Sequence, residues 1–314
     1  MTRRGLERGR VFLGVVVLVG GCAWPADASP LKIRDIRPLF QITETPAGPL
    51  ALPTDVAVGP QGRIYVVDGG NHRVLAFDRA GRYLFSIGRE GSAAGEFRGP
   101  VGIGVDGAGR VYVADSGNHR IQVFDASGRI LHGFRVTSGG AAVRPVDVAV
   151  DGRGGRLYVS GSNNHKVMVF TPDGKPVREW GGEGAGRGEF RYPATVAISG
   201  EGRVHVVDVL NTRVQVFDGR GRFLADVGEW GVLPGQFFRP KGVALDRRGR
   251  VYVTDSYMDL IEVFDESGRF LHVLSGEGRI KKFTSPAGIA IDTDDRLIVA
   301  EVLANRVSVF SLGR

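Results

Sequence analysis

The stretch VADSGNHRIQVFD, residues 113–125, brings four chemically capable side chains into six residues. Asp115, Asn118, His119 and Arg120 supply a carboxylate, an amide, an imidazole and a guanidinium. This set would suit acid–base catalysis, metal binding or the binding of an anion. It would also suit a tight turn, because Asp accepts hydrogen bonds from turn amides and Asn tolerates a left-handed backbone. A catalytic site is needed once, whereas a turn device can recur, so the rest of the sequence separates these interpretations.

The same residue types recur along the chain, in DGGNHR (68–73), DVLNTR (208–213) and EVLANR (301–306). In each copy the acid ends one short apolar strand and the arginine begins the next. Acid and arginine therefore flank one hairpin and can pair across it. Because a site used once would not need to be repeated, we interpret the set as a structural device of the turn. Its members are Asp68, Asn71, Arg73, Asp115, Asn118, Arg120, Asp208, Asn211, Arg213, Glu301 and Arg306.

Three copies depart from the pattern. The third reads SGSNNHK, in which we place Ser160 at the acid position with one extra residue. The fifth reads DSYMDLI, in which Met258 replaces Asn and Leu260 replaces Arg, and the sixth has Ala304 at the Asn position. Tyr257 and Met258 make the fifth turn amphipathic. Such a turn indicates either drift within a repeat array or a recognition patch for a partner.

Three histidines, His72, His119 and His165, occupy the same position in three successive copies. Three imidazoles are a common ligand set for zinc. Equivalent positions on neighbouring units of a ring diverge, however, unless they point toward the axis. We therefore do not predict a metal site from these histidines.

A longer pattern surrounds each copy and repeats six times. Each repeat opens with a proline and a short alternating apolar strand, and successive prolines are 47, 45, 48, 47 and 46 residues apart. Three further short strands follow, separated by glycine-containing turns and by the acid–Asn–Arg turn. Alternation predicts strands with one buried face, and glycine supplies the positive φ that hairpin turns need. The openings are PTDVAV at Pro53, PVGIGV at Pro100, PVDVAV at Pro145, PATVAI at Pro193, PKGVAL at Pro240 and PAGIAI at Pro286.

Four strands in each repeat describe one blade of a β-propeller. We therefore predict an all-β fold, a six-bladed β-propeller of four-stranded antiparallel blades. The sixth repeat lacks a fourth strand, and RPLFQIT from Arg37 matches the fourth strand of the first repeat, RYLFSIG from Arg82. We predict that residues 36–43 supply the outer strand of the last blade, residues 286–310, and so close the ring.

The repeats resemble NHL repeats. The resemblance rests on the acid, Asn and Arg of DGGNHR, DSGNHR and DVLNTR, and on GEF or GQF before the proline in GEFRGP, GEFRYP and GQFFRP. It covers residues 36–314 and implies a propeller. The family includes RNA-binding modules, protein-interaction modules, sensor domains and the peptidyl-amidoglycolate lyases, so the fold alone implies no activity.

The activity of the lyase members of this family can be tested against individual residues of this sequence. A resemblance to them would imply metal-binding histidines after the strand-opening prolines, near the central axis. The residues at these positions are Thr54, Val101, Val146, Ala194, Lys241 and Ala287. Because none of them is a histidine, we do not predict this activity.

Arginine stands just before four of the six opening prolines. We expect these side chains close to the mouth of the central channel, where converging guanidinium groups would favour an anionic or carboxylate-bearing ligand. The alternative is a solvated rim in an arginine-rich protein. The candidate binding residues are Arg98, Arg144, Arg191, Arg239 and Lys241, together with Tyr257 and Met258.

The first residues indicate export. A basic leader, MTRRGLERGR, precedes VFLGVVVLVGG, which is apolar but short for a membrane span. Cys22, the single cysteine, follows directly and resembles the lipidated cysteine of a bacterial lipobox. We predict a signal peptide over residues 1–21, an anchor and linker over 22–35 and the propeller over 36–314. The alternative is an ordinary signal peptide that is cleaved later, near ADASP, and removes Cys22.

We expect this chain to bind a partner rather than to catalyse a reaction, because the sequence shows no converging acid–base or metal-binding set. The predicted partner is a protein or peptide that meets the loop face in the periplasm or at the outer membrane, with membrane attachment through the lipid anchor alone. No cofactor is predicted, and the fold unit is expected to be monomeric. The formal net charge of +7 falls when the leader is removed, and the mild excess that remains does not indicate nucleic-acid binding. The alternatives are a lyase or hydrolase with a metal-assisted site, such as an axial Ca²⁺, and a soluble periplasmic location.

Overall fold

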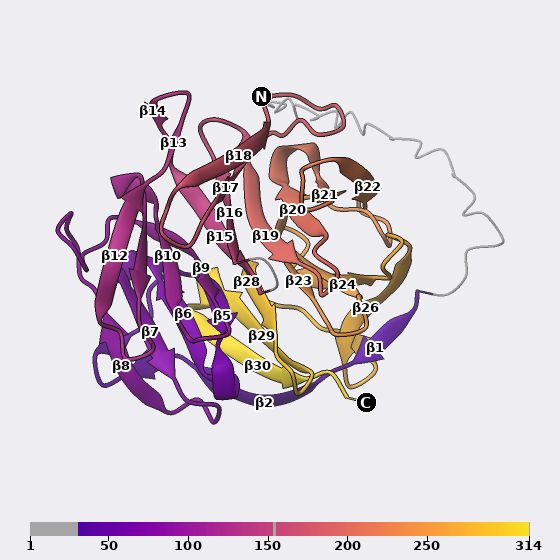
Figure 1. The fold of residues 1–314 in the computed structure, drawn as a ribbon. Coiled ribbons are helices and arrows are strands. Elements are labelled where there is room, and N and C mark those ends of the chain that lie inside the picture. Colours follow the sequence, from indigo (N-terminus) through magenta and orange to yellow (C-terminus); the bar gives the residue numbers. More distant parts are fainter. Residues whose placement is uncertain (1–30, 153–154, 314) are drawn as a thin grey trace, which may run out of the picture. The chain divides into compact units, whose positions relative to one another are not determined.

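The computed structural model describes residues 31–152 and 155–313. In this part of the chain, four-stranded antiparallel sheets repeat in sequence order and form the six blades of a β-propeller (Figure 1). The fold predicted from the repeats is confirmed. The predicted signal peptide and Cys22 lie outside the described residues.

We number the blades 1 to 6 in chain order and give the strands of each from the innermost outward. Blade 1 contains β5 (Pro53–Val58), β6 (Ile64–Asp68), β7 (Arg73–Phe77) and β8 (Tyr83–Ile87). Blade 2 contains β9 (Pro100–Val105), β10 (Val111–Asp115), β11 (Arg120–Phe124) and β12 (Ile130–Arg135). Blade 3 contains β15 (Pro145–Asp151), β16 (Arg156–Gly161), β17 (Lys166–Phe170) and β18 (Pro176–Gly181).

The second half of the ring has the same organisation. Blade 4 contains β19 (Pro193–Ile198), β20 (Val204–Asp208), β21 (Arg213–Phe217) and β22 (Phe223–Val227). Blade 5 contains β23 (Pro240–Leu245), β24 (Val251–Asp255), β25 (Leu260–Phe264) and β26 (Phe270–Gly276), with the short β27 (Arg279–Ile280) beside it. Blade 6 contains β28 (Pro286–Ile291), β29 (Arg296–Glu301), β30 (Arg306–Ser311) and the N-terminal β2 (Arg37–Ile42).

Short elements lie in the connections between blades and in the turns within them. Two small hairpins pair β3 (Glu44–Thr45) with β4 (Gly48–Pro49), and β13 (Thr137–Ser138) with β14 (Ala141–Ala142). The 3₁₀ turns are η1 (Pro60–Gly62), η2 (Gly69–Asn71), η3 (Ser116–Asn118), η4 (Val209–Asn211) and η5 (Val302–Ala304). In the part of the chain that the structure describes, no helix is long and apolar enough to cross a membrane.

The core lies between neighbouring blades, where the apolar faces of their strands pack together. Phe97, Phe190 and Phe237, which come just before the opening prolines of blades 2, 4 and 5, are fully buried. Phe97 packs against Phe124 at the end of the third strand, with 5.7 Å between ring centroids, and the other two make equivalent contacts. The GEF and GQF signatures therefore serve packing.

Blade 6 combines a strand from near the start of the described chain with three strands from its end, and this closes the ring. β2 pairs antiparallel with β30, in a register that matches Arg37 with Ser311 and Ile42 with Val307, and so supplies the outer strand that the sequence predicts. The innermost strands contact one another in sequence around the axis, and β28 of blade 6 contacts β5 of blade 1. In addition, β1 (Ile33–Asp35) pairs in parallel with β26 of blade 5. This strand lies before the predicted start of the propeller at residue 36.

The antiparallel order of the strands separates two faces. The turns between second and third strands and the connections between blades lie at one end of the sheets, which we call the mouth face. The turns between first and second strands and between third and fourth strands lie at the other end.

Candidate functional site

The turn after β10 in blade 2 holds the cluster around Asp115. This carboxylate is fully buried, and its Oδ2 accepts hydrogen bonds from Arg120 Nε at 2.7 Å and from Asn118 Nδ2 at 2.9 Å. Its Oδ1 accepts the backbone N–H of Arg98, in the connection from blade 1, at 2.8 Å. The Arg120 guanidinium also donates to three carbonyl oxygens of that connection. The charged groups of the cluster therefore hold the connection against the turn.

The arrangement recurs in three further blades. Its ion pairs are Asp68–Arg73, Asp208–Arg213 and Glu301–Arg306. All these carboxylates are buried, and Asn71 and Asn211 donate to the aspartates as Asn118 does in blade 2. Loss of the cationic partner would leave a buried charge without solvation, which is strongly destabilising.

In blades 1, 2 and 4 the left-handed residue follows the asparagine, so Asn118 does not take the left-handed backbone expected of it, whereas in blade 6 the left-handed residue is Asn305. Asn118 lies within η3, and the next residue, His119, has φ of 56°. His72 and His165 are left-handed at the same position, and their Nδ1 atoms accept backbone N–H groups from the connection to the next blade at 3.0 and 3.2 Å. Among the described residues, no group of three or more His, Cys, Asp or Glu side chains is placed to hold a metal ion.

Blade 3 lacks the buried carboxylate, and strand register shows which residue replaces it. Gly161 pairs with Pro145, in the register that Asp115 has with the opening proline of blade 2. The acid position is therefore Gly161, and the prediction that Ser160 occupies it with one extra residue is wrong. Asn163 takes over part of the role, because its Oδ1 accepts a backbone N–H from the preceding connection at 2.8 Å.

Blade 5 keeps the acid and replaces its partners. Asp255 is fully buried and accepts four backbone N–H groups, two from the connection and two from its own turn. Leu260 and Met258 stand where other blades have Arg and Asn. Backbone amides thus satisfy a carboxylate that the sister blades neutralise with a guanidinium.

Glu262 of blade 5 occupies the position of Gln122 in blade 2. Its side chain is 2% exposed, its Oε1 accepts the Gly235 N–H at 3.0 Å, and among the described residues no hydrogen-bond partner reaches Oε2. Gln122 uses its Nε2 to donate to Asp115 and to a loop carbonyl. Burial, with the neighbouring charge of Asp255, raises the pKa of Glu262 to about 8. At neutral pH Glu262 is therefore an uncharged acid, and its proton can replace the amide N–H of glutamine.

The mouth of the central channel is a pocket of about 310 Å³. All six innermost strands contribute to its wall, mainly with hydroxyl and apolar side chains such as Thr54, Val101 and Ala194. In the described lining, Lys241 is the one charged side chain, and its Nζ lies 6.0 Å from the ring centroid of Tyr192. Burial, followed by the charge of Arg239, lowers the pKa of Lys241.

The four arginines predicted at the mouth stand around it. The side chains of Arg98, Arg144, Arg191 and Arg239 are exposed, and none belongs to the described lining of the pocket. Their backbone carbonyls accept N–H groups from the turns of the mouth face, which keeps the arginines beside those turns. The predicted convergence of guanidinium groups is thus not found in this lining.

The predicted patch in the fifth turn is only partly exposed. Tyr257 is 63% exposed, and its ring stacks on Phe238 with 4.1 Å between centroids. Met258 is half-buried, and its backbone carbonyl accepts a hydrogen bond from Lys282 Nζ at 2.8 Å. Tyr257 is therefore the residue of this pair that a partner can reach.

Two carboxyl groups meet near the axis, one residue further along the innermost strands than the mouth residues. Asp55 of β5 and Asp147 of β15 are 7% and 4% exposed and are hydrogen-bonded to each other. Each accepts a backbone N–H from the next blade, at 3.0 Å from Ile103 and 2.8 Å from Val196. Burial raises the pKa of both groups, and the charge of Asp147 adds to the effect at Asp55, so the pair holds a shared proton.

This pair corrects the prediction that no acids converge. The sequence comparison used the residue directly after each proline, whereas the two aspartates stand one position later. Glycines of neighbouring blades make room for them, since a Cβ at Gly102 would overlap Asp147 and a Cβ at Gly288 would overlap Asp55. The signal in the sequence was a charged residue inside two otherwise apolar strands, PTDVAV and PVDVAV.

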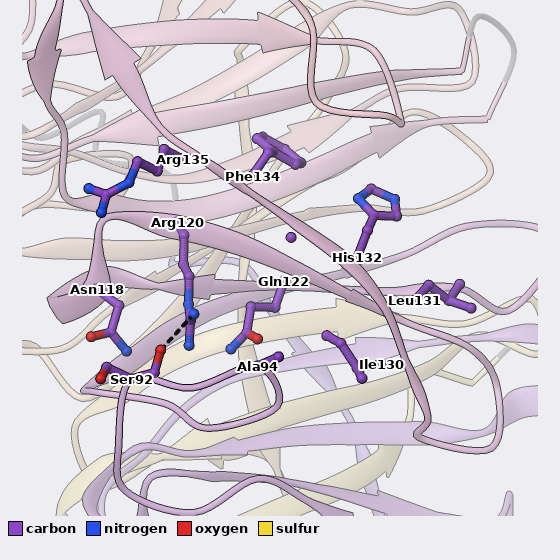
Figure 2. A pocket seen from close by; sticks show the side chains of 11 residues that line it. Ser92, Ala94, Asn118, Arg120, Gln122, Ile130, Leu131, His132, Phe134 and Arg135 are labelled. Carbon is purple, nitrogen blue, oxygen red and sulfur yellow. Dashed lines mark hydrogen bonds between the residues drawn. The ribbon is translucent and has the colours of Figure 1, made fainter.

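A larger pocket, of about 520 Å³, lies at the outer edge of blade 2, away from the axis. Figure 2 shows Asn118, Arg120 and Gln122 along one wall and side chains of β12, including His132 and Phe134, along another. Arg120 and Gln122 are committed to the turn device described above. Two of the polar side chains that line this pocket are therefore already used in the hydrogen bonds of the turn.

The comparisons with known proteins agree with this architecture. The model of the NHL repeat matches residues 50–77 and 97–124, which end with the third strands of blades 1 and 2. The chain thus contains NHL repeats in a six-bladed β-propeller, as the resemblance implied. No curated protein matches it.

Solved structures with a similar fold include several propellers. A gluconolactonase from Xanthomonas campestris has a TM-score of 0.66 at 16% identity, covering 90% of this chain and 96% of the other. Hydrazine synthase from Kuenenia stuttgartiensis has 0.60 at 14% identity, covering 85% and 96%. Virginiamycin B lyase from Staphylococcus aureus has 0.58 at 12% identity, covering 82% and 79%. At these identities the likeness shows the fold alone.

Proposed function

We propose that this propeller binds a protein or peptide partner through its mouth face, and that an anionic group of the partner enters the axial mouth. The observation that carries the proposal is Lys241, the one charged side chain in an otherwise uncharged described lining. An ammonium that has lost part of its water gains from pairing with an anion, because the attraction is stronger where solvent is partly excluded.

The surroundings of the mouth support this proposal. Arg191 and Arg239 are exposed just before the opening prolines of blades 4 and 5. Positive charge around a pocket attracts an anionic partner and speeds its approach. In this role the arginines direct the encounter, while Lys241 makes the contact.

The cellular setting is part of the proposal. The basic leader, the short apolar stretch and Cys22 favour export and a lipid anchor in the cell envelope, at the outer membrane where the cell has one. The propeller would then meet its partner in the periplasm or at the membrane surface, as a monomeric unit.

Binding can be tested with arrays of hexapeptides that have randomised last residues, made once with free C-terminal carboxylates and once as amides. We expect the purified propeller to bind free-carboxylate peptides, and Lys241→Met to weaken that binding by about tenfold or more. Lys175→Met is the matched control, because Lys175 lies in an exposed turn on the opposite face. Equal binding by both variants would contradict the role of Lys241, and an absence of peptide binding would contradict the proposed function.

The alternative function is an enzyme, a lyase or hydrolase with a metal at the axis. The specific observation in its favour is the Asp55–Asp147 pair, whose shared proton a divalent cation could replace. Metal analysis of the purified protein distinguishes the two functions. One tightly held cation per chain that is lost in Asp147→Asn would favour catalysis, and a metal-free protein that still binds peptides would favour the binding module.

A further inference from the structure

On the mouth face, exposed large apolar side chains are concentrated over blades 4 to 6, although Leu52, 48% exposed, stands before the opening proline of blade 1. The difference is clearest at one position of the turn between second and third strands, two residues after the acid position. There blades 4, 5 and 6 carry Leu210, Tyr257 and Leu303, which are 62%, 63% and 70% exposed. Blades 1, 2 and 3 carry Gly70, Gly117 and Asn163.

The connection that leads into blade 5 adds to the apolar side. Its exposed residues are Trp230, Val232 and Leu233, which are 71%, 60% and 52% exposed. The connections into blades 2 and 4 have Glu, Ser and Ala, and Glu, Ala and Gly, at these positions. Two separate elements, the turns and the connection, therefore carry apolar residues on the same part of the ring, where other blades have small or polar ones. We call Leu210, Tyr257, Leu303, Trp230, Val232 and Leu233 the apolar crescent.

The turn residues of the crescent border the axial mouth, and Trp230, Val232 and Leu233 extend it outward along the connection into blade 5. Ser256 and Val302, which line the mouth, are the chain neighbours of Tyr257 and Leu303. The Leu210 N–H donates at 3.1 Å to the carbonyl of Arg191, directly before Tyr192 of the lining. Lys241 extends from blade 5, so the cation and the crescent lie on the same side of the channel.

Exposed apolar residues gathered on one surface indicate a place where a partner excludes water. The apolar area gives affinity without direction, whereas the cation beside it fixes one end of the ligand. The mouth is a small cavity, and the Asp55–Asp147 pair lies one residue further along the same innermost strands. A chain end fits such a place better than a chain that must continue.

We propose that the apolar crescent binds the last residues of a partner protein that ends in apolar side chains, with its free α-carboxylate in the mouth against Lys241. This inference rests on the proposed function and names the chemical class of the ligand. The carboxylate could also come from an Asp or Glu side chain within a partner, and the peptide arrays separate these two sources.

The test replaces the three exposed turn residues together, in the variant Leu210→Ser/Tyr257→Ser/Leu303→Ser. These side chains are mostly in solvent, so the fold should be retained, and an unchanged thermal transition verifies this. The matched control is Leu84→Ser/Leu131→Ser/Leu224→Ser, which removes three exposed leucines, 41%, 43% and 49% exposed, from outermost strands. Both variants are compared with the unmodified protein on the same hexapeptide arrays.

We expect the unmodified protein to select Leu, Ile, Val, Phe or Trp among the last three positions of free-carboxylate peptides. The crescent variant should bind the selected peptides about tenfold or more weakly, and the control variant within about twofold of the unmodified protein. Amidated peptides with an internal Asp or Glu that bind equally well would overturn the chain-end assignment. Peptide binding without apolar preference and without an effect of the crescent variant would overturn this inference alone, whereas binding of no peptide would remove the proposed function as well.

Discussion

Blades 2 and 5 share strand order, register and a fully buried aspartate at the end of the second strand, yet they neutralise that aspartate differently. In blade 2, Asp115 is held by the side chains of Arg120, Asn118 and Gln122. In blade 5, Asp255 is held by four backbone N–H groups. The comparison teaches that where the repeat has a buried carboxylate at this place, its hydrogen-bond donors can change.

The surfaces of the two blades also differ. In blade 2 the arginine fixes the preceding connection by binding its carbonyl oxygens, and the exposed turn position is a glycine. In blade 5 no arginine is needed, and the turn and connection carry Tyr257 and Trp230 into solvent. Blades 4 and 6 expose Leu210 and Leu303 at the same turn position and keep their arginines, so apolar exposure does not depend on the change of donors.

The largest effect is expected where the donors of blade 2 are removed. Arg120→Leu copies the residue of blade 5 without its compensating backbone arrangement, so it leaves Asp115 buried and without its cation. We expect unfolding in urea to lose about 3–5 kcal/mol of stability. Arg129→Leu is the control, because the Arg129–Asp125 pair is largely exposed and should change stability by less than about 1 kcal/mol. Similar losses in both variants would contradict the comparison.

A large and pH-dependent gain is expected from Glu262→Gln, which gives blade 5 the glutamine of blade 2. Because the folded protein raises the pKa of Glu262 to about 8, it keeps a proton that the unfolded chain has lost above its ordinary pKa. This group therefore stabilises the fold fully at pH below the unfolded value and loses that contribution as the pH rises to about 8.

We expect the variant to match the unmodified protein at about pH 4 and to be more stable by on the order of 3 kcal/mol at about pH 9. The measurement is chemical denaturation of both proteins across this pH range, read as the difference between them. Asp55 and Asp147 titrate in both proteins, so their contributions cancel. A difference that does not change with pH would show that Glu262 is not held as a neutral acid.

A smaller, opposite effect is expected from Gln122→Glu in blade 2. The new carboxyl must keep its proton to donate to Asp115, or else it leaves the buried acceptors without a donor. We expect a loss of about 2 kcal/mol at neutral pH that shrinks as the solution is acidified. A neutral result at pH 7 would mean that blade 2 can rearrange its donors as blade 5 does.

The sequence was sufficient for the fold, because its information is periodic. Prolines at near-constant spacing and four short strands per repeat predict six blades, and the match of RPLFQIT with RYLFSIG predicts the closing strand. The parallel pairing of Ile33–Asp35 with β26 was missed, because three residues carry too little alternation to indicate a strand.

The site was harder to predict, because it depends on which positions face the axis. The sequence predicted Lys241 beside the mouth, and this side chain lines the pocket there, but nothing in the spacing of the arginines shows where their flexible side chains lie. The Asp55–Asp147 pair joins strands from blades 1 and 3, and only the closed ring brings them together. The place of Gly161 became clear only from strand register, since SGSNNHK can be aligned in two ways.

The apolar crescent was also not predicted, although its residues are visible in the sequence. Tyr257 was noticed because it stands in an aberrant turn, while Leu210 stands in a turn that follows the pattern and Leu303 in one whose noted departure is Ala304. A leucine in a repeat is ordinarily assigned to the core. Its exposed fraction in the folded ring is what separates it from packing residues.

A crystal structure of the protein with a hexapeptide selected from the free-carboxylate array would test the central claim most directly. The account predicts the terminal carboxylate within hydrogen-bond distance of Lys241 Nζ and the apolar side chains of the peptide over Leu210, Tyr257 and Leu303. A peptide bound over blades 1 to 3, or in the pocket beside β12, would contradict it.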